Sequence, residues 1–427
     1  MTLRSYEYKQ FGERLYYGRI KDRLPMYYIQ KPGFTKSYVT LSLPLGSIHR
    51  GYMDSNGIHD VPSGIAHFLE HKVFEKDGMD RSREFSVDEA SINAFTEHHQ
   101  TTYLFTTANH VKRNTKRLID MVFRPQFSNK GIENEKKIIT EELNMHLDDP
   151  GYKQYVGLMN NLYVNHPIKD DILGTKEDIL SMHSDDLTSM HEAYYRPERA
   201  ALVVVSALDP YAFFEELSNE VILPPLSDKA PKDVAYDEPI NVSKASEAVS
   251  LDVRMPSTLF GIKFKPLAHT DPFERIKTRM ALSMWLDLAF GRSSDTYEML
   301  MDQGVINDSY ALELNYTKDF AYALIGSETS RPTALKQSLG ALLENPREIT
   351  INEADFERLK RQMIGSFIHV LDSPENIAHQ FANYVFEGVA YYDLIEAARA
   401  ITYDYVVDQV NAVHPGAISV HTILNTL

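Results

Sequence analysis

The sequence predicts two related α+β domains, each a sheet with helices packed on one face. The chain has 427 residues, of which 43% are hydrophobic and 24% are charged, as expected for a globular protein of more than one domain. Segment 223–247 is rich in Pro, Ser, Lys and Asp and lacks apolar periodicity, which is typical of a linker. Each half begins with strand-like runs and continues into long helical stretches. We therefore expect domains at 1–222 and 248–427, separated by this linker.

The spacing of apolar residues predicts the elements of each domain. Alternating and β-branched residues are typical of strands, and apolar residues three or four positions apart are typical of helices. In the first half these patterns predict, in order, a strand at 38–43, a helix at 63–74 with Ser63 as its N-cap, a strand pair within 92–107, helices at 111–123 and 134–147, and a strand at 201–206. In the second half they predict a strand-like run at 249–265, followed by helices.

Composition excludes several classes of function. The chain has no cysteine, so disulfides, thiol nucleophiles and sulfur-ligated metals are excluded, and a transition metal must be held by His, Asp or Glu. The 60 acidic and 44 basic residues give a net charge of −16, which argues against nucleic acid as a partner. This acidity either favours basic peptides or serves solubility alone. Without the roughly 18 consecutive apolar residues of a membrane span, or the apolar core of a signal peptide, we expect a cytoplasmic protein with no membrane partner.

The candidate metal site begins with His67, Glu70 and His71. On a helix, residues three and four positions apart share one face, so the two imidazoles can converge on one ion while the carboxylate points to its edge. The order His-x-x-Glu-His is the reverse of the familiar His-Glu-x-x-His zinc motif. The alternative is a surface ion pair on a polar helix face.

A third protein ligand must come from another element, because a catalytic zinc has three protein ligands and one open position. The helix at 134–147 places Glu135 and Glu142 on one face, with Ile138 and Ile139 on the buried side. Glu142 is the candidate ligand, and Glu135 is a candidate hydrogen-bond partner of a ligand histidine. A solvated acidic helix is the alternative.

These motifs resemble the pitrilysin, insulysin and mitochondrial processing peptidase family of inverzincin zinc metallopeptidases. The resemblance rests on His67-Phe68-Leu69-Glu70-His71, and on Glu135 and Glu142 in a helix that ends at Asp148-Asp149-Pro150. It covers most of 20–207, with further matches at Asn93-Ala94-Phe95-Thr96, Thr102-Tyr103, Pro125, His166-Pro167, Gly174 and Tyr195-Arg196-Pro197. Within the family, the chain is similar to the bacterial two-domain form. That form implies mainly antiparallel sheets and a related second domain that lacks the zinc motif.

The resemblance also implies a function. It implies a zinc metalloendopeptidase that hydrolyses peptide bonds of short or unfolded peptides in an enclosed chamber. One zinc ion would be held by His67, His71 and Glu142, and Glu70 would act as the general base on zinc-bound water, with Glu135 also in the catalytic set.

The resemblance further implies a substrate-binding strand. An edge strand with Asn93, Ala94 and Thr96 would bind extended peptide by adding it to the sheet. For Asn93 the alternative is a turn-capping role.

The second domain departs from the family pattern. Relatives that act alone carry an Arg and a Tyr there, which bind substrate and stabilise the oxyanion. Tyr310 is present in the matching region, but no arginine stands at the expected place. We therefore expect a heterodimer with a related subunit that lacks the zinc motif, or otherwise a homodimer that uses Tyr310 and a donor that the sequence does not identify. A noncatalytic peptide-binding or scaffold subunit of a processing-peptidase-like complex is the alternative function, and a small-molecule metallohydrolase has no supporting motif.

Overall fold

The computed structural model describes residues 2–226 and 231–426, and these form two compact units. Within the described residues, unit 1 comprises Met1–Asn144, Asp170–Ala235 and Ile368–Phe386, and unit 2 comprises Met145–Lys169, Tyr236–Phe367 and Glu387–Leu427. Each unit therefore contains a segment from the other half of the sequence. Residues 227–230 of the expected linker lie outside the described residues, so the linker stays a prediction.

The sheet of unit 1 is mainly antiparallel. Its strands follow the order β1-β2-β3-β11-β4-β10-β9, with β3 and β11 as the parallel pair. In the central antiparallel pair, Val39 of β4 lies opposite Val204 of β11. The strands of unit 1, including two short hairpins, are β1 (Arg4–Tyr8), β2 (Glu13–Ile20), β3 (Leu24–Gln30), β4 (Ser37–Leu43), β5 (Gly51–Asp54), β6 (Gly57–Asp60), β7 (Glu75–Lys76), β8 (Met79–Asp80), β9 (Ser91–Thr96), β10 (Thr101–Thr107) and β11 (Ala201–Ser206).

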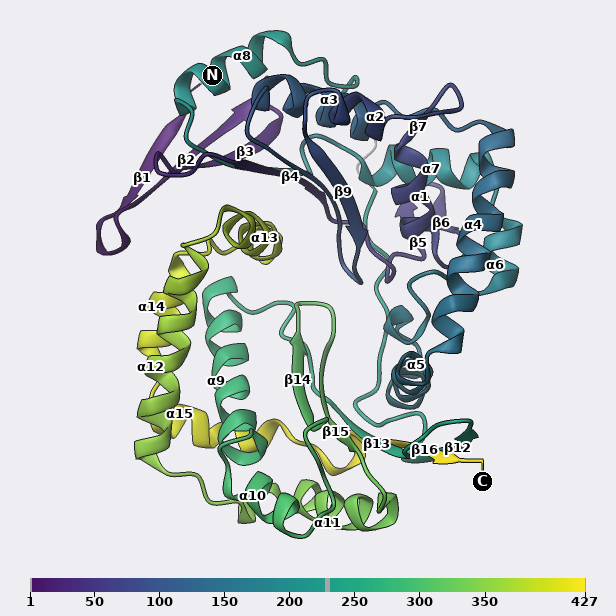
Figure 1. Cartoon of the computed structure of the whole chain (residues 1–427), viewed down its shortest axis with the longest axis vertical. Coiled ribbons are helices and arrows are strands. Elements are labelled where there is room, and N and C mark those ends of the chain that lie inside the picture. The colour runs from purple at the N-terminus through teal and green to yellow at the C-terminus, as the bar shows by residue number, and fades with distance from the viewer. Residues whose placement is uncertain (1, 227–230, 427) are drawn as a thin grey trace. The chain divides into compact units, whose positions relative to one another are not determined.

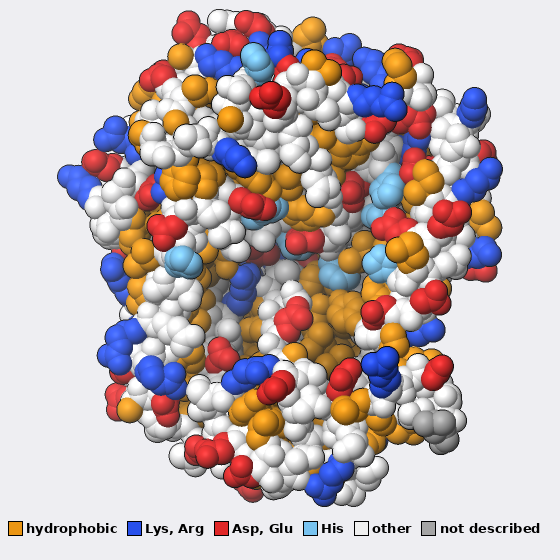
Figure 2. Space-filling model, viewed as in Figure 1, with side chains coloured by type: hydrophobic (Ala, Val, Ile, Leu, Met, Phe, Trp, Pro, Cys, Tyr) orange, Lys and Arg blue, Asp and Glu red, His pale blue; other side chains and the backbone are white. Residues whose placement is uncertain are grey.

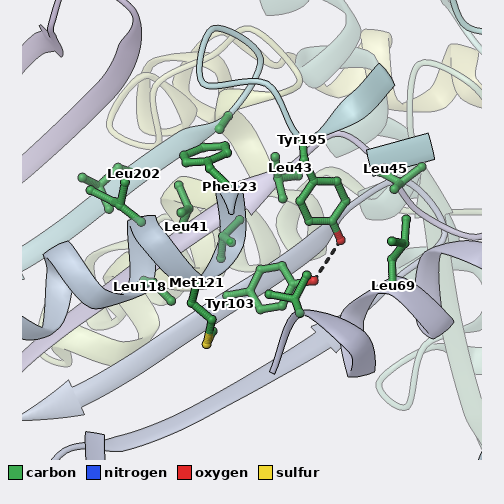
Figure 3. Packing of buried hydrophobic residues seen from close by; sticks show 14 of the residues in the cluster. Leu41, Leu43, Leu45, Leu69, Tyr103, Leu118, Met121, Phe123, Tyr195 and Leu202 are labelled. Carbon is green, nitrogen blue, oxygen red and sulfur yellow. Dashed lines mark hydrogen bonds between the residues drawn. The ribbon is translucent and has the colours of Figure 1, made fainter. Parts of the chain in front are cut away.

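One face of this sheet carries most of the helices and the apolar core. Leu41 and Leu43 of β4 and Leu202 of β11 pack with Leu118 and Met121 of α3 (Figure 3). The helices of unit 1 are α1 (Ile65–Val73), α2 (Ser82–Ser86), α3 (Val111–Phe123), α4 (Asn129–Asp148), whose last turn passes into unit 2, α6 (Lys176–Ser181), α7 (Ser184–Tyr194), α8 (Pro210–Glu220) and α13 (Pro374–Val385).

The other face of the central strands is covered by α13, which comes from the C-terminal half of the chain (Figure 1). The hydroxyl of Tyr38 on β4 and Nε2 of His379 on α13 form a hydrogen bond of 2.8 Å. The next residue, Val39, points to the opposite face and lies in the core with α3. Because both faces are covered, β4 and β11 are buried along their whole length.

Unit 2 repeats this plan with fewer strands. Its sheet has the order β12-β16-β13-β15-β14, with β12 and β16 as the parallel pair. Helices α5 and α11 cover opposite faces, since Gly261 of β13 contacts Leu162 of α5 whereas Phe260 contacts Gly340 of α11. The elements are β12 (Ser246–Leu251), β13 (Ser257–Lys263), β14 (Ala311–Tyr316), β15 (Ala321–Glu328), β16 (Ile418–Asn425), α5 (Pro150–Leu162), α9 (Pro272–Phe290), α10 (Asp295–Asp302), α11 (Pro332–Glu344), α12 (Glu353–Val370), α14 (Asp393–Ala400) and α15 (Tyr403–Val407). The predicted fold class of two sheet-containing α+β halves is confirmed.

Several elements differ from the sequence-based expectation. The run at 249–265 forms two strands, β12 and β13, rather than one. Pro256 stands at the break, where it has no backbone N–H to give to a ladder. The strands β1, β2 and β3 are not among the elements that the sequence predicts.

Helix α1 begins at Ile65, and its N-cap is not the expected Ser63. Gly64 is the N-cap residue, with a left-handed φ of 82°. A Cβ atom at this position would lie 2.0 Å from the carbonyl oxygen of Leu173, so the chain before α6 packs directly on the backbone at the start of α1. This contact fixes the position of the helix that carries His67 and His71.

Charged side chains of both signs are interspersed over the visible surface (Figure 2). Although the net charge is −16, acidic and basic side chains are not separated into different regions of this face. Of the helices in residues 2–226 and 231–426, none combines the length and the apolar character that crossing a membrane requires.

We expect Gly64→Ala to lower the free energy of unfolding of unit 1 by about 2 kcal/mol or more, because alanine must adopt a left-handed conformation and its Cβ must displace backbone. The matched control is Gly12→Ala, since Gly12 has a φ of 66° but no atom within 4 Å of the Cβ position. Its expected loss is about 1 kcal/mol. Urea denaturation of both variants measures the difference, and equal losses would contradict a structural role for the Leu173 contact.

Candidate metal centre

Helix α1 presents His67, Glu70 and His71 together, as their spacing predicts. Phe68 and Leu69 of the same helix are fully buried in the core of unit 1, which anchors α1 beside the sheet. The ring centroids of His67 and His71 lie 4.6 Å apart. His67 is 7% exposed and Glu70 is 9% exposed, whereas the side chains of His71 and Glu142 are partly exposed.

Helix α4 supplies the carboxylates. Ile139 and Leu143 are buried in the same core as α1, which turns the side of α4 that carries Glu135 and Glu142 toward the histidines. The sequence also places Ile138 on the buried side, and this prediction is wrong. Ile138 is 52% exposed, because one residue turns a helix by about 100° and Ile139 takes the core position.

Glu142 lies opposite both histidines. Its Oε1 is 3.7 Å from Nε2 of His67, and its Oε2 is 3.7 Å from Nε2 of His71. These separations are too long for hydrogen bonds. One ligand atom from each of the three residues lies within 4.8 Å of the others, so the groups surround a single point.

This donor set fits zinc. Zinc bonds to nitrogen and oxygen of about 2.0–2.2 Å imply tetrahedral ligand atoms roughly 3.4 Å apart. The observed separations of 3.7 Å are close to that value. Two imidazoles and one carboxylate are also a set that hydrolytic zinc sites use. His67, His71 and Glu142 could therefore hold such an ion with little rearrangement.

Glu135 orients His71. Its Oε1 lies 3.0 Å from Nδ1 of His71. A proton on Nδ1 in this bond leaves Nε2 as the ligand atom. Burial alone would lower the pKa of His71, but the hydrogen bond to Glu135 and the nearby carboxylates outweigh it and raise that pKa. Burial would raise the pKa of Glu135, but the bond to His71 and the charge of Lys72 lower it, so Glu135 stays ionised.

Glu70 is held apart from the three candidate ligands. The hydroxyl of Thr96 on β9 donates a hydrogen bond of 2.6 Å to Oε2 of Glu70. Burial raises the pKa of the Glu70 carboxyl group, and the charge of Glu142 adds to this, while Thr96 and His71 oppose it. A carboxyl group in such surroundings is suited to gain and lose a proton.

A cavity of about 520 Å³ adjoins the site. Glu70, His71, Glu135, Asn93 and Ala94 are among the residues that line it. The side-chain oxygen Oδ1 of Asn93 accepts a hydrogen bond of 2.9 Å from the backbone N–H of Ala94. This bond is local to β9, and the roles of Asn93 in substrate binding and in turn capping both stay predictions.

Tyr310 lies in unit 2, where it is 2% exposed. Its hydroxyl donates a hydrogen bond of 2.7 Å to the carbonyl oxygen of Phe290. The hydroxyl is therefore engaged within the unit, and the substrate-binding role expected for Tyr310 stays a prediction.

Three further residues surround the site without a predicted role. Lys72 is fully buried and forms an ion pair with Glu75.

The hydroxyls of Tyr103 and Tyr195 lie 2.8 Å apart in the core near α1 (Figure 3). Burial raises the pKa of both tyrosines, so this pair stays neutral close to Glu70. Two signals in the sequence could have pointed to these residues. Lys72 stands in an otherwise apolar helix turn, and Tyr103 and Tyr195 are among the positions that match the family.

Several known proteins are similar to this chain in sequence or in fold. Residues 26–176 match the family described as Insulinase (Peptidase family M16). The chain is 34% identical over 411 residues to the uncharacterized zinc protease YmfH of Bacillus subtilis, a match that covers 95% of each chain. The fold is similar to that of an M16-like peptidase from Alicyclobacillus acidocaldarius, with a TM-score of 0.90, 24% identity and coverage of 100% and 99%. It is also similar to a peptidase M16 inactive domain from Pseudomonas fluorescens, with a TM-score of 0.77, 14% identity and coverage of 100% and 98%.

These similarities confirm the resemblance drawn from the His-x-x-Glu-His motif and the two glutamates of α4. The match to a protein named as a zinc protease extends over nearly the whole of both chains, and the matched family segment contains all the candidate metal ligands. The chain belongs to the insulinase family, peptidase family M16.

Proposed function

We propose that this chain is a zinc-dependent metalloendopeptidase acting on short or unfolded peptides. The observation that carries the proposal is the convergence of His67, His71 and Glu142 around one point, with Glu70 beside them. These three residues would hold one zinc ion and leave a fourth position open. The name of the Bacillus relative supports zinc as the metal.

Glu70 is the proposed general base. Zinc held by these residues would polarise a carbonyl group and would make water acidic enough to ionise near neutral pH. Glu70 takes a proton from the water, since its carboxylate is not needed as a ligand, and its raised pKa lets it carry this proton to the leaving nitrogen. The hydroxyl of the water adds to the carbonyl carbon and the C–N bond breaks, which gives a carboxylic acid group and an amine.

The edge strand β9 is the proposed peptide-binding element. It is the last strand of the unit 1 sheet and pairs with β10 on one side. An extended peptide can add to the other side through backbone hydrogen bonds, largely independent of its sequence. Asn93 and Ala94 of this strand line the same cavity as Glu70, so a peptide bound there would pass the metal centre. Cleavage inside an enclosed chamber, which would select flexible peptides, is part of this proposal.

We further propose that a related subunit without the zinc motif completes the active site. Tyr310 is buried and already bonded to Phe290, which weakens the alternative of a homodimer that uses Tyr310. A cytoplasmic location belongs to the same proposal.

A noncatalytic peptide-binding subunit is the second candidate function. The observation that favours it is the similarity to the M16 inactive domain from Pseudomonas fluorescens. Loss of catalysis in such a subunit would be expected to leave gaps in the metal site, whereas His67, Glu70, His71 and Glu142 are all present here. Zinc-loaded protein that binds peptides but cleaves none, with or without a partner, would support this second candidate.

Replacing Glu70 by glutamine should abolish turnover and spare the metal. We expect Glu70→Gln to lower kcat for a quenched fluorescent peptide by a factor of about 10² to 10⁴, because the proton acceptor is lost. Zinc content, measured on the same preparation by elemental analysis, should equal that of the wild type. An active, zinc-loaded variant would rule out Glu70 as the base.

Removal of zinc should abolish cleavage, and re-added zinc should restore it.

We expect Glu142→Gln to weaken zinc binding by a factor of about 100 or more, since losing a metal ligand should reduce the affinity more than losing a hydrogen-bond partner of a ligand does. Glu141→Gln is the matched control, because Glu141 precedes Glu142 on α4 but is exposed. Chelator competition measures both affinities. Equal affinities in the two variants would contradict the assignment of Glu142 as ligand.

The partner proposal makes its own prediction. We expect the purified chain to cleave peptides slowly, and to speed up by about tenfold or more when mixed with a paralogue that carries the Arg and Tyr pair, because these groups stabilise the oxyanion. Kinetics on the chain alone and on the reconstituted pair measure the effect. Equal rates would leave the homodimer as the better description.

A further inference from the structure

Lys72 is a buried lysine next to the metal centre, and the proposed reaction does not use it. Its side chain is 0% exposed, and it follows His71 on α1. Its ammonium group pairs with Glu75 and lies 3.6 Å from Oε2 of Glu135. The other oxygen of Glu135, Oε1, receives Nδ1 of His71. A single carboxylate is therefore held between Lys72 and a candidate metal ligand.

Glu75 connects this group to the first turn of α4. The hydroxyl of Ser128 donates a hydrogen bond of 3.4 Å to Oε1 of Glu75. The same carboxylate packs on Gly131, where a Cβ atom would lie 2.3 Å from Oε1, so glycine leaves the room that the carboxylate occupies. Lys72 thus joins the end of α1 to two successive turns of α4, the helix that carries Glu135 and Glu142.

Burial of this lysine is costly for stability alone. An ammonium group removed from water needs anionic partners, and a buried ion pair is often no more stable than apolar residues of the same size. Methionine has a similar length and, together with an uncharged residue in place of Glu75, would fill the space without that cost. The position of the charge therefore indicates a role in the neighbouring site.

We propose that Lys72, supported by Glu75, is a positioning residue for the ligand His71. The ammonium group holds Oε2 of Glu135, which directs Oε1 to Nδ1 of His71 and leaves Nε2 of His71 facing Glu142 and the metal. This inference rests on the proposed zinc function and adds a residue from outside the ligand and base set.

Zinc affinity, measured by competition with a chromophoric chelator, tests the proposal without relying on activity. We expect Lys72→Met to weaken zinc binding by roughly tenfold, within the range for partners of metal-binding histidines. In a Glu135→Gln background the same substitution should change the affinity by less than about twofold, because Lys72 acts through Glu135.

Two variants separate positioning from stability. Lys31→Met is the matched control, because Lys31 and Glu13 form a mostly buried ion pair in unit 1 away from the cavity residues. It should leave zinc affinity unchanged. Lys72→Met/Glu75→Gln removes the charge imbalance, so we expect it to fold and to regain thermal stability while zinc binding stays weak. If Lys72→Met alone does not fold, the zinc affinity of this double variant tests the proposal in its place.

The outcomes distinguish this inference from the proposed function. Wild-type zinc affinity in Lys72→Met, recovery of affinity together with stability in the double variant, or a full tenfold effect in the Glu135→Gln background would each overturn the positioning role and leave the zinc peptidase standing. A wild-type chain that binds no zinc would overturn both.

Discussion

The placement of α4 against α1 is the constraint on which the metal centre depends. A single helix turn can direct two imidazoles to one point, but it has no third group to close the site. Here that group comes from a second helix, and Ile139 and Leu143 fix its rotation by packing in the core with Phe68 and Leu69. The apolar packing of unit 1 therefore places the carboxylate of Glu142 where it can bind the same metal ion as the two histidines.

Electrostatics set a second condition on the same region. Glu70, Glu75, Glu135 and Glu142 lie around two imidazoles and one ammonium group, in surroundings where water screens charge poorly. The Thr96 hydroxyl bonds Glu70, and Lys72 pairs with Glu75. Glu135 contacts both Lys72 and His71, whereas Glu142 faces both histidines. This division of partners separates the roles of two of them, since the pKa of Glu70 is raised whereas that of Glu135 is lowered.

Local patterns were sufficient to predict much of the site. The His-x-x-Glu-His spacing predicted a shared helix face, and the spacing of Glu135 and Glu142 predicted a second one, because helical periodicity depends only on nearby residues. Burial was harder to predict. Ile138 and Ile139 have the same side chain, and only the packing of α4 decides which of them faces the core.

Contacts between distant segments explain what the sequence did not reveal. The start of α1 depends on Leu173, which the residues around Ser63 do not indicate. The strands β1 and β2 are rich in tyrosine and charged residues, and the burial of β3 becomes clear only when β11 is placed beside it. Lys72 looks like an ordinary helix residue until Glu75 and Glu135 are seen on either side of it.

The position of α13 has a consequence for how the chain acquires its structure. Tyr38 and His379 are 341 residues apart in sequence, yet they bond across one face of the central strands. During synthesis, β4 and β11 emerge long before α13, so one side of the first sheet stays uncovered until most of the chain has been made. Contacts of such long range slow folding and expose apolar surface to aggregation. The two units are thus expected to mature together near the end of translation, and not one after the other.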